Sequence, residues 1–127
     1  GDEYRVITRD HNYKLLLDEK LESGEISLEE YARESAQAEA LISFLGMGNV
    51  SLIDTGRMRL NDRDQVLLCS DGLYRSLQDD QIAQIVAAGI GNPEKTADFL
   101  TACAFDEGQG AQDNTSVILI EYREEEL

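Results

Sequence analysis

The sequence predicts a layered α+β fold, because its strand-like and helix-like segments are partly segregated along the chain. The expected order is one strand, two helices, two or three strands, two helices and a last strand. A length of 127 residues suits one domain, and a hydrophobic fraction of 42% suffices for an ordinary core. The chain contains no internal repeat and no linker, so it is interpreted as part or all of a single domain.

The first expected elements are a strand and a helix. Residues that favour β-structure fill Tyr4–Thr8, which predicts a short strand. Leucines recur at near-helical spacing from Asn12 to about Glu22, which predicts a helix. Ser23 and Gly24 follow directly and are expected to end it.

A second helix is expected to open at Ser27, because Glu30 lies three residues further on, at capping-box spacing. This helix is expected to run to about Ala38. The glycine-containing segment Ser43–Gly48 then predicts a loop.

The middle of the chain is strand-like. β-forming residues predict one or two strands over Val50–Asp54 and Met58–Leu60. Asn61–Asp64 has the composition of a turn. The run Gln65–Cys69, apolar from Val66 onward, predicts a buried strand.

Two more helices are expected before the last strand. Ser76, with Asp79 three residues further on, predicts a capped helix that reaches about Ala88. Asn92-Pro93 then opens a helix that runs to about Phe105.

The last strand, Thr115–Tyr122, carries apolar residues on both faces, so we expect it to be central and covered. A central strand needs a neighbour on each side. Because the chain offers few other strands, this pattern is a first sign that part of the domain is absent.

The charge balance narrows the classes of partner. The chain carries 11 basic and 26 acidic residues, for a net charge of −15. This balance argues against nucleic acids and anionic membranes, which are bound by Lys and Arg. Most of the acids fit a solvated surface, whereas a few could be metal ligands, and the charge count alone cannot separate these readings.

Cysteine and apolar patterning narrow the class further. Cys69 and Cys103 lie in apolar stretches and are expected to be buried core residues. A single histidine and the absence of Cys-x-x-Cys argue against a zinc cluster. No apolar run approaches 18 residues, and Gly1–Tyr4 shows no signal-peptide pattern, so we expect a cytoplasmic protein without a membrane segment in this chain.

Two carboxylates flank the buried strands. Asp71 follows the strand Gln65–Cys69, and Asp113 precedes the strand Thr115–Tyr122. If these strands are antiparallel neighbours, both carboxylates lie at the same end of the sheet, where they suit Mg²⁺ or Mn²⁺. Gly72 allows a sharp backbone turn beside Asp71. Alternatively, Ser-Asp-Gly is an ordinary turn and Asp-Asn an ordinary approach to a strand.

Several motifs resemble, in order, those of the metal-dependent Ser/Thr phosphatases of the type 2C (PPM) family, in its bacterial form. The matching segments are Ile7–His11 (the family's Leu-Thr-x-Asp-His), Leu21–Tyr31, Leu41–Gly46 (its Leu-Thr-Arg-x-Leu-Gly), Val66–Leu77 with Asp79–Val86 (its Ser-Asp-Gly signature), and Gln112–Val117 (its closing Asp-Asn motif). Ile42 and Ser43 replace the family's Thr and Arg, which leaves the role of that arginine open.

The resemblance implies part of a four-layer α/β/β/α sandwich, in which helices cover two antiparallel sheets. Residues 1–127 would form the C-terminal portion of one phosphatase domain. Within it, residues 9–48 resemble a flap-like helical segment, residues 49–122 would form core strands and helices, and residues 123–127 are an acidic tail. The family's N-terminal segments Gly-Asp-Ser-Arg and Asp-Gly-His-Gly-Gly are not found, so we interpret the N-terminal half as absent.

The resemblance also assigns roles to single residues. Asp71 and Asp113 resemble metal ligands, and Asp10 resembles an acid that helps to hold a third, weaker ion. Alternatively, Asp10 is a plain loop acid or a cap of the following helix. Asn114 is expected to order its loop, and Gly72 is a backbone requirement. No catalytic side chain is identified in the chain itself.

The implied function is hydrolysis of phosphoserine and phosphothreonine in proteins by a water that two or three Mg²⁺ or Mn²⁺ ions activate. Expected partners are phosphorylated proteins and either the missing half of the domain or a second copy of the chain. The isolated chain is expected to be inactive. The alternative is a phosphatase-like pseudoenzyme that acts as a binding or regulatory module.

Overall fold

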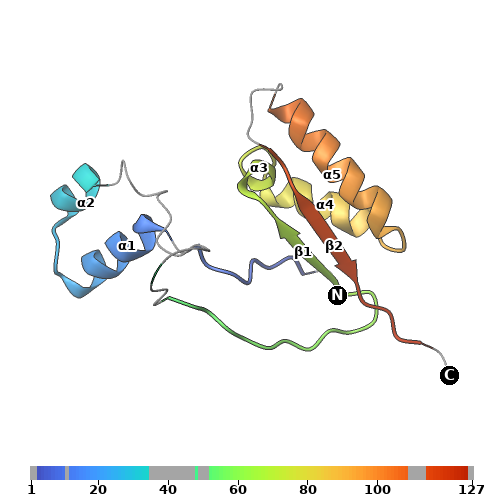
Figure 1. Cartoon of the computed structure of the whole chain (residues 1–127), viewed down its shortest axis with the longest axis horizontal. Coiled ribbons are helices and arrows are strands. Elements are labelled where there is room, and N and C mark those ends of the chain that lie inside the picture. Colours follow the sequence, from blue (N-terminus) through green and yellow to red (C-terminus); the bar gives the residue numbers. More distant parts are fainter. Residues whose placement is uncertain (1–2, 11, 35–47, 49–51, 109–113, 126–127) are drawn as a thin grey trace. The chain divides into compact units, whose positions relative to one another are not determined.

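The computed structural model describes residues 3–10, 12–34, 48, 52–108 and 114–125. It consists of two compact units: residues 5–57 form a helical-hairpin unit, and residues 1–4 with 58–127 form a sheet unit (Figure 1). The predicted end of the second helix, most of the loop at Ser43–Gly48, and Asp113 lie outside the described residues. The predicted division at residues 9–48 and 49–122 remains a prediction.

The hairpin unit begins with α1 (Tyr13–Ser23), which confirms the first predicted helix. The Asn12 side chain caps it, accepting a hydrogen bond from the Leu15 N–H at 3.2 Å. Gly24 ends it with a φ of 80°, a left-handed conformation that favours glycine. Both helix ends are therefore set by residues directly beside them in the sequence.

The second helix, α2 (Leu28–Glu34), starts where the sequence predicts. The Ser27 hydroxyl accepts a hydrogen bond from the Glu30 N–H at 3.2 Å. Two tyrosine–carboxylate hydrogen bonds join the helices, from Tyr13 to Glu34 at 2.8 Å and from Tyr31 to Asp18 at 2.7 Å. These bonds raise the pKa of both tyrosine hydroxyls, because the hydrogen bond favours the protonated phenol.

Three predicted strand segments are not strands in the structure. Tyr4–Thr8, Met58–Leu60 and the described residues 52–54 have no regular secondary structure. The side chain of Arg9, which follows the first segment, forms an ion pair at 2.7 Å with Asp54, the last residue of the segment 52–54. β-forming residues are not enough for a strand, because the backbone groups need a neighbouring strand to pair with.

The sheet unit contains a two-stranded antiparallel sheet. Strands β1 (Gln65–Cys69) and β2 (Val117–Glu121) pair with Gln65 opposite Glu121 and Cys69 opposite Val117. Both strands were predicted, although β2 is shorter at each end. The predicted turn at Asn61–Asp64 precedes β1, and the Asp64 N–H donates to the Asn61 carbonyl at 3.0 Å.

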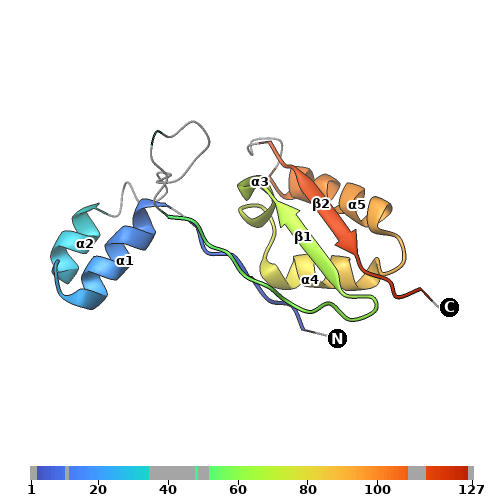
Figure 2. The ribbon, with the colours of Figure 1, turned by 60° about the horizontal axis from the view of Figure 1, so that its bottom comes forward.

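Three helices cover one face of this sheet: α3 (Asp71–Tyr74), α4 (Asp79–Ala88) and α5 (Pro93–Glu107). Figure 2 shows them gathered on one side of the two strands. Leu67 and Val117 point from the strands toward these helices and pack against the core. The buried core consists of Leu73, Leu77, Ile82, Leu100 and Ala104.

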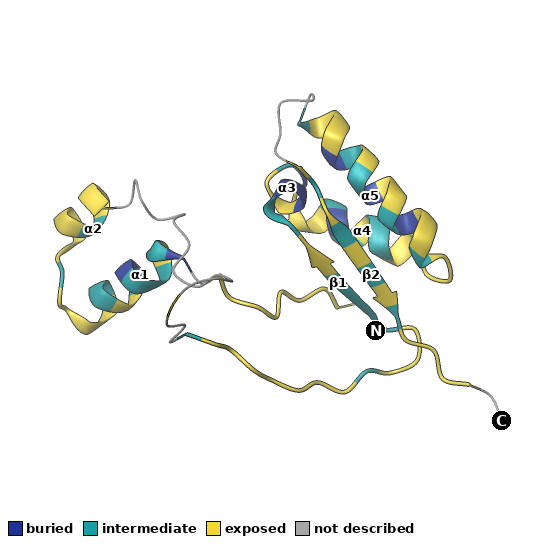
Figure 3. Ribbon diagram, in the orientation of Figure 1, coloured by how far each residue is buried: buried dark blue, intermediate teal, exposed yellow. Residues whose placement is uncertain are grey.

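The other face of the sheet is open in the described part of the chain (Figure 3). Leu68, Ile118 and Ile120 are exposed by 51%, 62% and 49%. The expectation that the last strand is central and covered is therefore wrong for this chain, because β2 has one neighbour among the described residues and one bare face. The expectation that Cys69 is buried is also wrong, because Cys69 is exposed. Cys103 is half-buried and packs against the core.

The helix starts of the sheet unit follow the sequence in one case and depart from it in another. Asn92 caps α5 as predicted, accepting a hydrogen bond from the Lys95 N–H at 3.3 Å. The predicted cap of α4 at Ser76 is wrong, because the Ser76 N–H donates to the Leu73 carbonyl at 3.2 Å in the turn that ends α3. Helix α4 instead begins after Gln78. The short helix α3 itself was not predicted.

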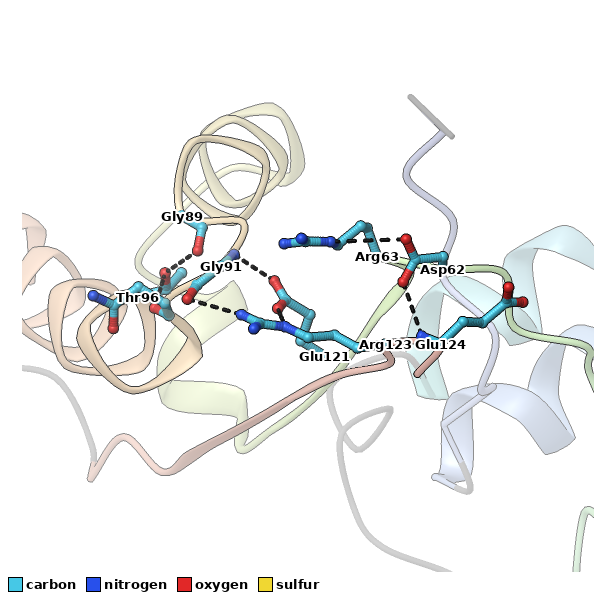
Figure 4. Close-up of polar contacts among 9 residues, drawn as sticks. Asp62, Arg63, Gly89, Gly91, Thr96, Glu121, Arg123 and Glu124 are labelled. Carbon is cyan, nitrogen blue, oxygen red and sulfur yellow. Dashed lines mark hydrogen bonds and ion pairs between the residues drawn. The ribbon is translucent and has the colours of Figure 1, made fainter. Parts of the chain in front are cut away.

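A buried carboxylate ties the end of β2 to the loop between α4 and α5 (Figure 4). The Glu121 side chain is only 2% exposed. It accepts hydrogen bonds from the Gly91 N–H at 2.6 Å and from Arg123 Nε at 2.7 Å. Arg123 also donates to the Gly91 carbonyl at 3.0 Å, which closes a three-residue network.

Within the described residues, no helix is long and apolar enough to cross a membrane.

This network predicts an acid-dependent loss of stability. The Gly91 hydrogen bond, followed by the Arg123 hydrogen bond, lowers the pKa of Glu121 below its ordinary value of 4.5. A carboxyl with a lowered folded-state pKa stabilises the fold above its unfolded pKa, and this stabilisation is lost as the pH falls through the folded-state pKa. We therefore expect Glu121→Gln to unfold at lower urea than wild type at pH 7, with the difference shrinking below pH about 4.5.

The measurement is urea unfolding of both proteins, followed by circular dichroism across this pH range. Glu124→Gln is the matched control, because Glu124 is exposed and its substitution removes the same charge from the same end of the chain. If Glu121→Gln and Glu124→Gln respond alike at every pH, the network does not stabilise the fold.

Candidate functional site

The site lies where β1 ends and β2 begins. Ser70, the residue after β1, joins the two segments through three hydrogen bonds. Its N–H donates to the Ser116 carbonyl at 2.9 Å. Its hydroxyl donates to the Asn114 carbonyl at 3.2 Å and accepts from the Ser116 N–H at 2.9 Å. The residues that follow β1 are therefore fixed beside the residues that lead into β2.

Gly72 packs directly against the approach to β2. A Cβ atom at this position would lie 2.6 Å from the Asn114 carbonyl oxygen and 2.7 Å from the Thr115 hydroxyl oxygen. Such distances are well inside van der Waals contact, and the nearer atom belongs to the backbone, which cannot rotate away. The close approach of two backbones thus supplies a physical reason for glycine beside Asp71.

Asp71 is the first residue of α3 and stands at this junction. Its side chain is 35% exposed, so its carboxylate can be reached from solvent. Arg75 Nε lies 3.4 Å from Asp71 Oδ2, one helical turn further on. The Arg75 N–H also donates to the Asp71 carbonyl at 3.0 Å. The junction therefore presents one accessible carboxylate with a cation beside it.

Known proteins share this arrangement of sequence and fold. No family model matches the chain. Protein phosphatase PhpP of Streptococcus pneumoniae is 32% identical over 126 residues, which cover 99% of this chain and 48% of that protein. Serine/threonine phosphatase stp of Listeria innocua is 32% identical over 121 residues, which cover 95% of this chain and 45% of that protein.

A solved structure of a phosphatase is also similar to this chain. The serine/threonine phosphatase of S. agalactiae superimposes with a TM-score of 0.70 at 25% identity, over 97% of this chain and 48% of that one. The chain is therefore similar in sequence and fold to part of the bacterial Ser/Thr phosphatases of type 2C. It spans about half the length of the curated relatives that it matches.

The three predicted metal ligands lie in different parts of the chain. Asp71 lies at the sheet junction described above. Asp113 is outside the described residues, although its neighbour Asn114 contacts Ser70 and approaches Gly72. Asp10 is an exposed residue of the hairpin unit. Its alternative role as a helix cap is wrong, because Asn12 caps α1.

The described residues do not contain a complete metal site. No group of three or more His, Cys, Asp or Glu side chains comes together among them. The roles of Asp71, Asp113 and Asp10 as ligands, and of Gly72 and Asn114 as structural residues, therefore remain predictions.

Two residues of the junction were missed by the sequence reading. Ser70 was treated only as part of the Ser-Asp-Gly motif, yet its hydroxyl both donates and accepts across the sheet. Arg75 was not singled out at all. The i,i+4 spacing of Asp71 and Arg75 is the signal that could have found this pair, but it required knowing that α3 is helical.

Proposed function

We propose that this chain supplies part of the metal centre of a phosphatase that hydrolyses phosphoserine and phosphothreonine in proteins. One observation carries the proposal: hydrogen bonds from Ser70 fix Asp71 at the junction of β1 and β2 in a chain similar to these phosphatases. The relatives named serine/threonine phosphatases motivate the substrate class.

The residues at the junction fit a hard divalent cation. The Asp71 carboxylate offers oxygen atoms that solvent can reach, and Mg²⁺ and Mn²⁺ prefer such ligands. Asp113 and, for a weaker ion, Asp10 are the further ligands of the proposal. With two or three ions bound, such a centre supplies an activated water and neutralises charge on the phosphoryl oxygens. Ser70 and Gly72 keep Asp71 in place.

The rest of the domain is the proposed partner of the bare sheet face. Leu68, Ile118 and Ile120 form an apolar surface that a second sheet would cover in a four-layer sandwich. A second copy of the chain could cover it instead. Because the chain spans about half of its relatives' length, we expect the isolated chain to have negligible activity. A cytoplasmic location is part of the same proposal.

The test is Mn²⁺-dependent hydrolysis of a phosphothreonine peptide by a protein that joins this chain to the remainder of the phosphatase domain. Loss of groups that only orient metal ligands typically costs about 10–100-fold. We therefore expect Asp71→Asn, which removes a ligand, to lower kcat/KM by at least about 100-fold. Asp98→Asn is the matched control, because Asp98 is exposed on α5 and loses the same charge.

The outcomes separate the alternatives. Equal activity of Asp71→Asn and Asp98→Asn would end the proposed role of Asp71. No metal-dependent hydrolysis by the wild-type protein would favour the phosphatase-like binding module. Robust hydrolysis by the 127-residue chain alone would contradict the need for the remaining half.

A further inference from the structure

Arg75 is held beside Asp71 by both its backbone and its side chain. It ends α3, and its N–H donates to the Asp71 carbonyl at 3.0 Å. Its Nε lies 3.4 Å from Asp71 Oδ2. Because the backbone bond fixes the i,i+4 spacing, the guanidinium is kept within reach of the carboxylate even though 54% of the Arg75 side chain is exposed.

We propose that Arg75 is a built-in competitor of the divalent cation at Asp71, and that it sets the metal affinity of this ligand. The inference rests on the proposed function, since it assumes that Asp71 binds metal. It concerns a positioning residue, because Arg75 acts through the Asp71 carboxylate rather than on a substrate.

Arg75 weakens cation binding at Asp71 in two ways, by competition for the carboxylate and by charge repulsion. A guanidinium is charged at every physiological pH, so its pairing with Asp71 is not switched by protonation of Arg75. A cation that binds Asp71 must displace Arg75 from the carboxylate or share the carboxylate with it. The displaced guanidinium then stays within a few ångströms of a doubly charged ion, which adds repulsion.

The pair is also weak enough to be displaced. Both side chains are partly exposed, and ion pairs in contact with solvent contribute little to stability. Metal binding is therefore weakened but not blocked. We expect Arg75→Gln to raise the Mn²⁺ affinity by about three- to tenfold, from the loss of this competition and repulsion.

The experiment titrates MnCl₂ into a protein that joins this chain to the remainder of the phosphatase domain and follows the broadening of the Gly72 and Leu73 amide signals by NMR. This paramagnetic readout reports binding at Asp71 without requiring activity. Arg59→Gln is the matched control, because Arg59 is an exposed residue of the same unit and its substitution removes the same charge. Arg75→Lys keeps the charge and is expected to bind Mn²⁺ within about twofold of wild type.

The outcomes distinguish this inference from the proposed function. Tighter binding by Arg75→Gln than by Arg59→Gln, with binding lost in Asp71→Asn, supports both. Binding lost in Asp71→Asn but equal in Arg75→Gln and Arg59→Gln overturns only the competition. Broadening that is unchanged in Asp71→Asn, or absent in wild type, overturns the metal role of Asp71 and the inference with it.

Discussion

Replacing Leu100 with alanine is expected to lower the free energy of unfolding of the sheet unit by about 2–5 kcal/mol. Leu100 is completely buried and lies in the middle of α5, the helix that packs against β2, α3 and α4. Its side chain belongs to a core with only four other fully or nearly fully buried members. Neighbours in so small a core can collapse only partly into the cavity, so we expect the variant to lose both the burial energy of the side chain and the contacts around the cavity.

The measurement is urea unfolding of wild type and variant, followed by the helix signal in circular dichroism. Phe99→Ala is the matched control, because Phe99 is the preceding residue of the same helix and is 57% exposed. It removes more atoms, yet we expect a change within about 0.5 kcal/mol. A similar loss in both variants would mean that α5 does not pack on the sheet through Leu100.

The features that the sequence predicted well are local. Asn92 caps α5 and Gly24 ends α1, as the residue types indicate. Each of these roles depends on hydrogen bonds or backbone angles within a few residues. Such features need no knowledge of the rest of the fold, which is why a single sequence suffices for them.

The strands depend on partners that lie far away in the sequence. Tyr4–Thr8 has the composition of a strand but no regular structure, because composition does not provide a neighbouring backbone. The strand β2 formed as predicted, but no segment that the structure describes covers its Ile118 and Ile120 side. Its double-sided apolar pattern matches a larger sheet assembly than this chain forms, which agrees with a chain of about half its relatives' length.

The pairing of β1 and β2 at the candidate site was predictable from the sequence, whereas the contacts at their junction were not. Asp71 and the Asp113-Asn114 segment were expected to meet at one sheet end if β1 and β2 are antiparallel neighbours, and this pairing is confirmed. The hydrogen bonds of Ser70 and the ion pair of Arg75 depend on side-chain geometry that no spacing rule gave. The sharp turn expected at Gly72 is replaced by a first helical turn packed against another backbone.

That packing leads to the second large expected effect. Gly72→Ala is expected to lower the free energy of unfolding by about 3 kcal/mol, at the upper end of the usual cost of overpacking. The added methyl group would meet the Asn114 carbonyl oxygen at 2.6 Å, and Ser70 holds that carbonyl in place through its hydroxyl. The clash can be relieved only if the segment that leads into β2 moves away from Asp71.

The measurement combines urea unfolding with NMR spectra of the variant under native conditions. Signals of Ser70, Asn114 and Ser116 are expected to shift most, because the hydrogen bonds that join them must adjust. Gly56→Ala is the control, since a Cβ atom there meets no atom within 4 Å. A Gly72→Ala protein as stable as Gly56→Ala, with unshifted junction signals, would show that the two backbones lie further apart than the structure has them. The rigid placement of Asp71 would then lose its support, because the close contact at Gly72 and the hydrogen bonds of Ser70 together position that carboxylate.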